Sequence, residues 1–248
     1  YVEGLGFSWD PDYRVGQNSE AFRESHDATY DFRFDESGSF PSEPFELNNL
    51  GPSSSCEIVD YAEPHQIDTH YKVLKMNDQD DQSILSSLHL NDNPDQGTVE
   101  LFLRSTDVNK TATLSLARDF TGISIRIKDR RWEHQASDGT WQEIPGMPSP
   151  NEADYHHLRI DFECSGQGYE GLSAGQYWLH VDGNRSENPL TFAVNEGSFD
   201  KLLISTGASD AGYELHVDAI GLSWDENSAI GDNLQVQKGF FDKSMVYF

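Results

Sequence analysis

The sequence predicts an all-β, antiparallel protein folded as a sandwich or a barrel. Apolar and polar residues alternate in every strongly periodic segment, for example over 123–128 and 158–163. A period of two is typical of strands that place one face on a core. Sequences that form tight turns, such as Asp138-Gly139 and Asp182-Gly183, separate these segments. No segment has the spacing of an amphipathic helix.

The expected strands follow one another at the short intervals of an all-β fold. Residues 36–68 are rich in Ser, Pro, Glu and Asn, and we expect them to form a long loop or an extension over the sandwich. The tail 239–248 is apolar and aromatic, which predicts a further strand. We expect the main strands near 28–35, 70–76, 83–90, 98–105, 111–117, 122–134, 140–144, 156–164, 176–182, 189–194, 199–206 and 212–224.

The two ends of the chain carry related sequences. Residues 1–18 align without a gap on residues 216–233, and both segments contain Ser-Trp-Asp after a short apolar strand. This duplication predicts that a structural unit ends with this strand and that units repeat along a longer chain. The alternative is one domain with similar first and last strands. The identical positions are Val2, Gly6, Ser8, Trp9, Asp10, Gly16 and Asn18, which match Val217, Gly221, Ser223, Trp224, Asp225, Gly231 and Asn233.

The charge of the chain excludes one class of partner. Asp and Glu number 43 against 17 Lys and Arg, which gives a formal charge of −26. Phosphate binding needs the opposite sign, so we expect no nucleic-acid partner. We also expect no membrane span, because the sequence lacks an apolar run of about 18 residues. The chain starts at Tyr1 without an initiating Met, so we expect it to be processed or excised from a longer precursor.

Cysteines and glycosylation sequences bear on a secreted location. Cys56 and Cys164 fit no metal-ligand spacing. In a secreted protein they would pair as a disulfide that closes a long loop, and the alternative is two buried free thiols. Asn109-Lys110-Thr111 and Asn184-Arg185-Ser186 are acceptor sequences for glycans in expected turns.

Calcium is the candidate cofactor, with two acidic turns as candidate sites, and otherwise we expect no cofactor. The first turn offers Asp78 and Asp80, and the second offers Asn91, Asn93 and Asp95. Oxygen ligands at alternate positions of a turn are the pattern from which calcium cages are built. The alternative is a solvated hairpin turn in each case. The nine His show no zinc-binding spacing.

Residues from Tyr155 onward resemble the central part of concanavalin-like and laminin-G-like lectin domains. The resemblance rests on the opening Tyr155-His156-His157, on the hairpin that ends in VDG at Gly183, and on a closing strand that contains Asp218 and Ile220. It covers roughly residues 28 to 225 and implies a jelly-roll sandwich. The closing phrase VDAIGLSWD is also similar to repeats in very large archaeal surface proteins. We therefore expect an end strand of a preceding repeat or an inter-subunit strand at 1–18, a jelly-roll domain at 19–233, and a strand or linker at 234–248.

Aromatic side chains near a groove are the candidates for stacking on sugar rings. We expect Trp132, Trp141 and Tyr177 in this role, with the remaining tryptophans in the core. No catalytic residue is predicted, because the acidic string Glu57–Glu63 lacks the spacing of a glycosidase pair. An alternative lyase site would need an arginine, a histidine or glutamine, and a tyrosine to meet on a concave face. The candidates are Arg126, Arg130, His134, His157, Tyr177 and His180.

These observations predict a non-catalytic extracellular module, a structural or adhesive repeat of a cell-surface fibre or filament with glycan binding in its groove. Its partners would be copies of itself, joined head to tail by strand addition, and a polysaccharide. The alternative is a secreted polysaccharide lyase or glycoside hydrolase, or the carbohydrate-binding module of such an enzyme.

Overall fold

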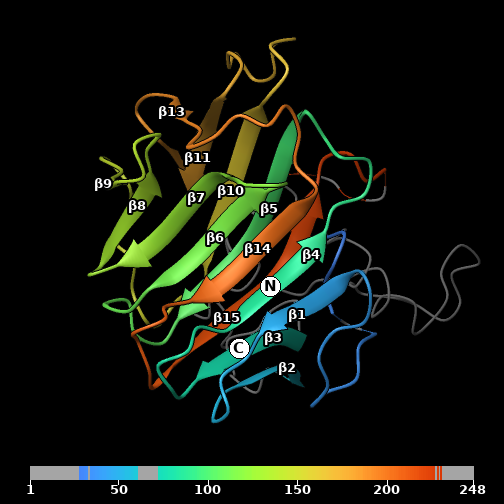
Figure 1. Ribbon diagram of the computed structural model, residues 1–248, viewed down its shortest axis with the longest axis vertical. Helices are drawn as coiled ribbons and strands as arrows, with labels where there is room; N and C mark the ends of the chain where they lie inside the picture. Colours follow the sequence, from blue (N-terminus) through green and yellow to red (C-terminus); the bar gives the residue numbers. More distant parts are fainter. Residues whose placement is uncertain (1–27, 33, 61–71, 227, 229, 231–248) are drawn as a thin grey trace, which may run out of the picture.

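The chain folds into two antiparallel β-sheets packed face to face (Figure 1). The computed structural model describes residues 28–32, 34–60, 72–226, 228 and 230. Among these residues there is no helix, and hence none that could span a membrane. The predicted jelly-roll β-sandwich is confirmed.

The seven-stranded sheet forms one layer. Its strands, in spatial order, are β1 (Phe45–Asn49), β4 (Leu85–His89), β14 (Lys201–Thr206), β6 (Ala112–Ala117), β7 (Thr121–Lys128), β8 (Arg131–Gln135) and β9 (Trp141–Glu143). The eight-stranded sheet forms the other layer. Its order is β12 (Asn184–Arg185), β11 (Gln176–Val181), β10 (His156–Glu163), β5 (Gln96–Ser105), β15 (Tyr213–Leu222), β3 (Lys72–Asp78) and β2 (Ser55–Asp60), and β13 (Leu190–Thr191) pairs with β11.

Alternate residues of each strand fill the space between the sheets. On β10, Leu158, Ile160 and Phe162 are at most 1% exposed, and the residues between them face away from the core. Burying one such side chain contributes about 1.5–3 kcal/mol to folding. The same alternation on the neighbouring strands makes one continuous hydrophobic core. The inward side chains of β5, β11 and β15 include Val99, Leu101, Leu103, Tyr177, Leu179, Val181, Leu215 and Val217.

Three predicted elements differ from the structure. The single strand expected at 122–134 is two strands, β7 and β8, because Asp129 and Arg130 adopt φ angles of 49° and 62° and turn the chain. Neither residue is Gly, so the sequence lacks the usual signal for a tight turn at this position. The expected loop 36–68 contains β1 and β2, and the expected strand 28–35 is reduced to an isolated bridge between Tyr30 and Ile220.

The second copy of the duplicated phrase forms the last part of β15. This strand lies inside the eight-stranded sheet and pairs with β5 on one side and β3 on the other. The first copy, at 1–18, and the tail 234–248 lie outside the described residues. The division into a preceding strand, a domain and a following segment therefore stays a prediction.

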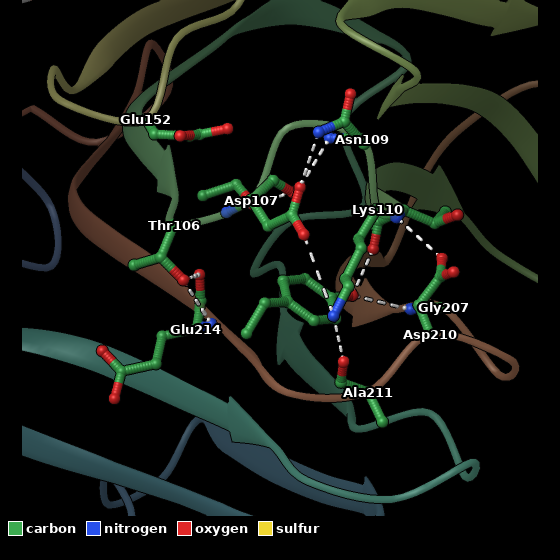
Figure 2. A network of polar contacts seen from close by, with 12 residues as sticks. Thr106, Asp107, Asn109, Lys110, Glu152, Gly207, Asp210, Ala211 and Glu214 are labelled. Carbon is green, nitrogen blue, oxygen red and sulfur yellow. Dashed lines mark hydrogen bonds and ion pairs between the residues drawn. The ribbon is translucent and has the colours of Figure 1, made fainter.

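The loop between β5 and β6 is tied to the hairpin between β14 and β15 (Figure 2). The Lys110 ammonium lies 3.8 Å from the Asp107 carboxylate and donates to the carbonyl of Ala211. The Asp210 carboxylate accepts the backbone N–H of Thr111 at 2.8 Å. Because these contacts join segments about 100 residues apart, they fix one end of the sandwich without any disulfide.

Candidate ligand-binding face

Polar and aromatic side chains gather on the outer side of the eight-stranded sheet. Because Leu158, Ile160 and Phe162 point into the core, the alternate residues of β10 point outward. Strand pairing sets Asp161 opposite Trp178 of β11 and opposite Thr98 of β5. We call this surface the Trp178 face, and it consists of Thr98, Arg159, Asp161, Tyr169, Trp178, His180 and Arg185.

Asp161 is the centre of the Trp178 face. Its carboxylate is 2% exposed and accepts hydrogen bonds from Thr98 Oγ1 at 2.5 Å and Arg159 Nε at 2.8 Å. The other carboxylate oxygen lies 3.0 Å from His180 Nε2. Burial by itself would raise the pKa of Asp161, but the hydrogen bonds from His180, Arg159 and Thr98 outweigh burial and hold the pKa below its ordinary range. Asp161 is therefore an ionised anchor that orients a cation and an imidazole.

Trp178 supplies a partly exposed aromatic ring beside this anchor. The Arg185 guanidinium lies 4.2 Å from the centre of the ring, and the indole N–H donates to the carbonyl of Glu170 at 3.2 Å. An arginine stacked on an aromatic ring is a favourable cation–π contact. The indole is thus held in one orientation while part of its surface stays open to solvent.

The loop 164–175 borders the face and is held by a buried carboxylate. Glu163 is fully buried, and its oxygens accept the backbone N–H groups of Ser165, Gly166 and Gly168 at 2.7–2.9 Å. The loop in turn carries Tyr169, whose hydroxyl lies 2.8 Å from Thr98 Oγ1. Glu163 therefore fixes the loop that places the Tyr169 side chain on the Trp178 face.

The face combines an aromatic surface with fixed hydrogen-bond donors. The side chains of Arg159 and His180 are 25% and 21% exposed, so both reach solvent next to Trp178. Sites for small polar ligands commonly join aromatic surface to a few oriented polar groups. The arrangement can hold a flat, hydroxyl-rich ligand against the indole.

Two of the three predicted sugar-stacking residues are wrong. Trp132 is 2% exposed and Tyr177 is completely buried, so neither ring can touch a ligand. Tyr177 lies on the inward side of β11, and its neighbour Trp178, which we expected in the core, lies on the outward side. A one-residue change of parity moves every side chain of a strand to the other face.

Trp141 is partly exposed, as predicted, but lies elsewhere. It belongs to β9 of the seven-stranded sheet, where the Arg126 guanidinium is 4.1 Å from the centre of its ring. Arg126 also pairs with Glu133 across β7 and β8, with a nitrogen–oxygen distance of 2.6 Å. Arg126 therefore serves a cross-strand carboxylate.

The six residues of the alternative lyase site do not meet. Arg126 and His134 belong to the seven-stranded sheet, and Arg130 lies in the turn beside it. Tyr177 points into the core, which leaves His157 of β10 and His180 of β11 on the side of the other sheet that faces away from the core. His157 is itself paired with Glu100 at 3.1 Å, and both side chains are at most 1% exposed.

The expected disulfide is wrong. Cys56 and Cys164 are both buried and free. Cys56 is on β2 and Cys164 follows β10, and three strands separate these two in the sheet. Four strand spacings are about 19 Å, well beyond the roughly 7 Å that a disulfide can bridge between Cα atoms. Burial raises the pKa of both thiols to about 12, which makes them poor nucleophiles.

At the first expected calcium turn, one carboxylate is buried and the other is bound by backbone groups. Asp78 is fully buried, and Asp80 accepts the backbone N–H groups of Ser53 and Gln82 at 2.9 and 3.0 Å. These bonds, that from Ser53 foremost, lower the pKa of Asp80. Among the described residues no three His, Cys, Asp or Glu side chains are grouped as metal ligands.

The second expected calcium turn, between β4 and β5, is open to solvent. Asn91 and Asn93 are exposed and Asp95 is partly exposed. Calcium binding at either turn stays a prediction. Glycosylation also stays a prediction, although Asn109 is exposed in a turn and Asn184 is exposed at the start of β12, where a glycan would find room.

Comparison with known proteins gives a likeness of fold alone. No protein-family model matches the sequence, and no curated protein matches it either. The carbohydrate binding module CBM66 from Bacillus subtilis is 11% identical over 75% of this chain and 99% of that one, with a TM-score of 0.45. The galectin LEC-6 of Caenorhabditis elegans is 12% identical over 55% of this chain and 89% of that one, with a TM-score of 0.38.

A longer protein shows the same degree of likeness. The receptor binding domain of botulinum neurotoxin type G is 11% identical over 78% of this chain, with a TM-score of 0.43. This chain spans only 45% of the length of that domain. At such identities the comparison does not indicate which residues bind a ligand, so the Trp178 face is judged on its own geometry.

Proposed function

We propose that the chain is a non-catalytic extracellular module that binds a glycan on the Trp178 face. The observation that carries the proposal is the partly exposed Trp178, flanked by Arg159, His180 and Arg185. One face of a sugar ring is lined by C–H groups that pack on an aromatic ring, while its hydroxyls take hydrogen bonds from neighbouring donors.

The site is organised before any ligand arrives. Asp161 fixes Arg159 and His180, and the backbone of Glu170 fixes the indole of Trp178. Side chains that are already oriented lose little conformational entropy on binding, and this raises affinity for a given set of contacts. An ordered surface of this kind suits recognition of a repeated sugar along a polymer.

The chain offers a matched pair of tryptophans to test this proposal. Trp178 and Trp141 both stack with an arginine, at 4.2 and 4.1 Å, but on opposite sheets. In isothermal titration against a panel of polysaccharides, Trp178→Ala should weaken binding at least about tenfold, which corresponds to about 1.4 kcal/mol. Trp141→Ala should leave the affinity unchanged. Equal losses in both variants, or a loss only in Trp141→Ala, would refute the assignment.

The same panel separates a binding module from an enzyme. A lyase would release sugars with an unsaturated uronate and a glycosidase would release reducing ends. We expect neither product from the wild-type protein. Steady turnover of any polysaccharide would show that the chain is a secreted enzyme and not a binding module.

The duplicated phrase favours a second role, as the repeat unit of a surface filament. Residues 216–222 of the second copy belong to β15, which pairs with β5 over Leu215–Leu222 and with β3 over Tyr213–Val217. We propose that the copy at 1–10 adds to, or braces, the sandwich of a neighbouring subunit. Strand addition satisfies open backbone groups, and head-to-tail contacts of this kind do not close on themselves.

Deletion of residues 1–10 tests the filament directly. We expect the full chain to form linear assemblies and the shortened chain to stay monomeric, as measured by light scattering and electron microscopy. Thermal unfolding of both proteins serves as the control for folding. If the shortened chain assembles like the full chain, the first copy does not join the subunits.

A further inference from the structure

The charges of the Trp178 face point to a particular class of sugar. Building on the proposed glycan binding, we infer that the ligand is anionic and that Arg159 and Arg185 hold its carboxylate or sulfate group. The whole chain carries a formal charge of −26 with only 17 basic residues. Two of these basic residues lie on the Trp178 face: Arg185 stacks on the partly exposed indole, and Arg159 lies two strands away, on the other side of His180. Guanidinium groups that reach solvent while the neighbouring Asp161 carboxylate is buried are the groups that would meet a negatively charged partner at this position.

Arg159 has the geometry to grip an anion. Its Nε donates to Asp161 at 2.8 Å, and among the described residues its two terminal nitrogens have no hydrogen-bond partner. A guanidinium held at one edge presents its remaining donors as a flat fork, which matches a carboxylate or a sulfate. The side chain is 25% exposed, so this fork reaches solvent.

Asp161 orients Arg159 without offering its own charge to the ligand. Its carboxylate is 2% exposed and is shared among Thr98, Arg159 and His180. The acidic side chain that a bound anion would meet is the exposed Glu170, which also acts electrostatically on Arg159. Removing this carboxylate should therefore strengthen binding of an anionic sugar.

The second arginine extends the positive surface across the indole. Arg185 is exposed on the edge strand β12 and stacks on Trp178 at 4.2 Å. A sugar that packs beside Trp178 would place its charged substituent between Arg159 and Arg185. A neutral sugar can use the indole and the hydrogen-bond donors but forms no ion pair with either arginine.

The test compares polymers that differ only in charge. Polygalacturonate is set against its carboxyl-reduced, neutral form, and dextran sulfate against dextran, by isothermal titration at about 0.15 M salt. At this ionic strength the Debye length is about 8 Å, so the net charge of the chain is screened while direct contacts persist. Wild type should bind the charged member of at least one pair about tenfold tighter or more. The pair that responds tells a carboxylate ligand from a sulfate.

The variants assign the selectivity to residues. Arg159→Gln and Arg185→Gln should each weaken binding of the charged polymer about tenfold more than binding of the neutral polymer, because only the charged polymer loses an ion pair. Glu170→Gln should tighten only the charged polymer. The matched control is Arg131→Gln on β8 of the other sheet, where Arg131 is 60% exposed beside Glu143. It removes the same charge and should change neither affinity.

Arg159→Gln removes a partner of the buried Asp161 and could therefore impair folding. Arg185 has an exposed side chain, so Arg185→Gln should fold normally and still test the inference. Equal binding of charged and neutral polymers by wild type, or unchanged selectivity in Arg185→Gln, would overturn the inference. In either case a loss of binding in Trp178→Ala would still support a glycan-binding face. No binding of any polymer would defeat the proposed function itself.

Discussion

Glu163→Ala is expected to destabilise the protein by about 3 kcal/mol at neutral pH. The carboxylate is fully buried and accepts hydrogen bonds from three backbone N–H groups and from the Ser165 hydroxyl. Alanine leaves those donors without partners inside the protein, which costs more than the bonds themselves contribute. Urea unfolding of the variant and of wild type gives the difference.

The effect of Glu163 should depend on pH. Burial would raise the pKa of this carboxyl group, but the hydrogen bonds from Gly166, Ser165 and Gly168 hold it below its ordinary value of 4.5. A depressed pKa in the folded state means that the stabilisation is fully present above about pH 4.5 and is lost as the pH falls through the folded value. The difference in stability between wild type and Glu163→Gln should therefore shrink in acid. A difference that is constant from pH 7 to pH 3 would contradict the ionised anchor.

Tyr177→Ala is expected to cost about 4 kcal/mol, a value typical of a large aromatic removed from a core. The ring is completely buried and lies 6.1 Å from the ring of Phe192, measured between centroids. Burial also raises the pKa of its hydroxyl group far above the ordinary value. Chemical denaturation measures the loss.

The neighbouring Trp178→Ala is the control for this prediction. Because Trp178 faces outward, its removal should change the unfolding free energy by no more than about 1 kcal/mol. If Trp178→Ala lowers the unfolding free energy more than Tyr177→Ala does, the inward and outward sides of β11 are assigned the wrong way round.

The fold class could be predicted from the sequence because alternation is a local property of each strand. The face of β11 could also have been predicted. Leu179 and Val181 share a side with Tyr177, while the polar His180 shares a side with Trp178. The larger indole suggested the core, although the pattern of its neighbours pointed outward. Periodicity along a whole strand is a better guide than the size of one residue.

Other features could not be read from the sequence. Thr98 and Asp161 are 63 positions apart and meet only because β5 pairs with β10. The turn at Asp129 and Arg130 uses positive φ angles without glycine. The partners of Glu163 are backbone N–H groups, which no residue type reveals. Such contacts depend on strand pairing and backbone conformation rather than on composition.

The central claim, that Trp178 contacts the glycan, can be tested by the indole N–H resonances. The chain has five tryptophans, and variants such as Trp178→Ala assign their signals in a proton–nitrogen NMR spectrum. On titration with polygalacturonate, dextran sulfate and their neutral forms, the Trp178 signal should shift while those of Trp132 and Trp141 stay in place. A spectrum in which Trp141 shifts and Trp178 does not, or in which no indole signal moves although the polymer binds, would contradict the account.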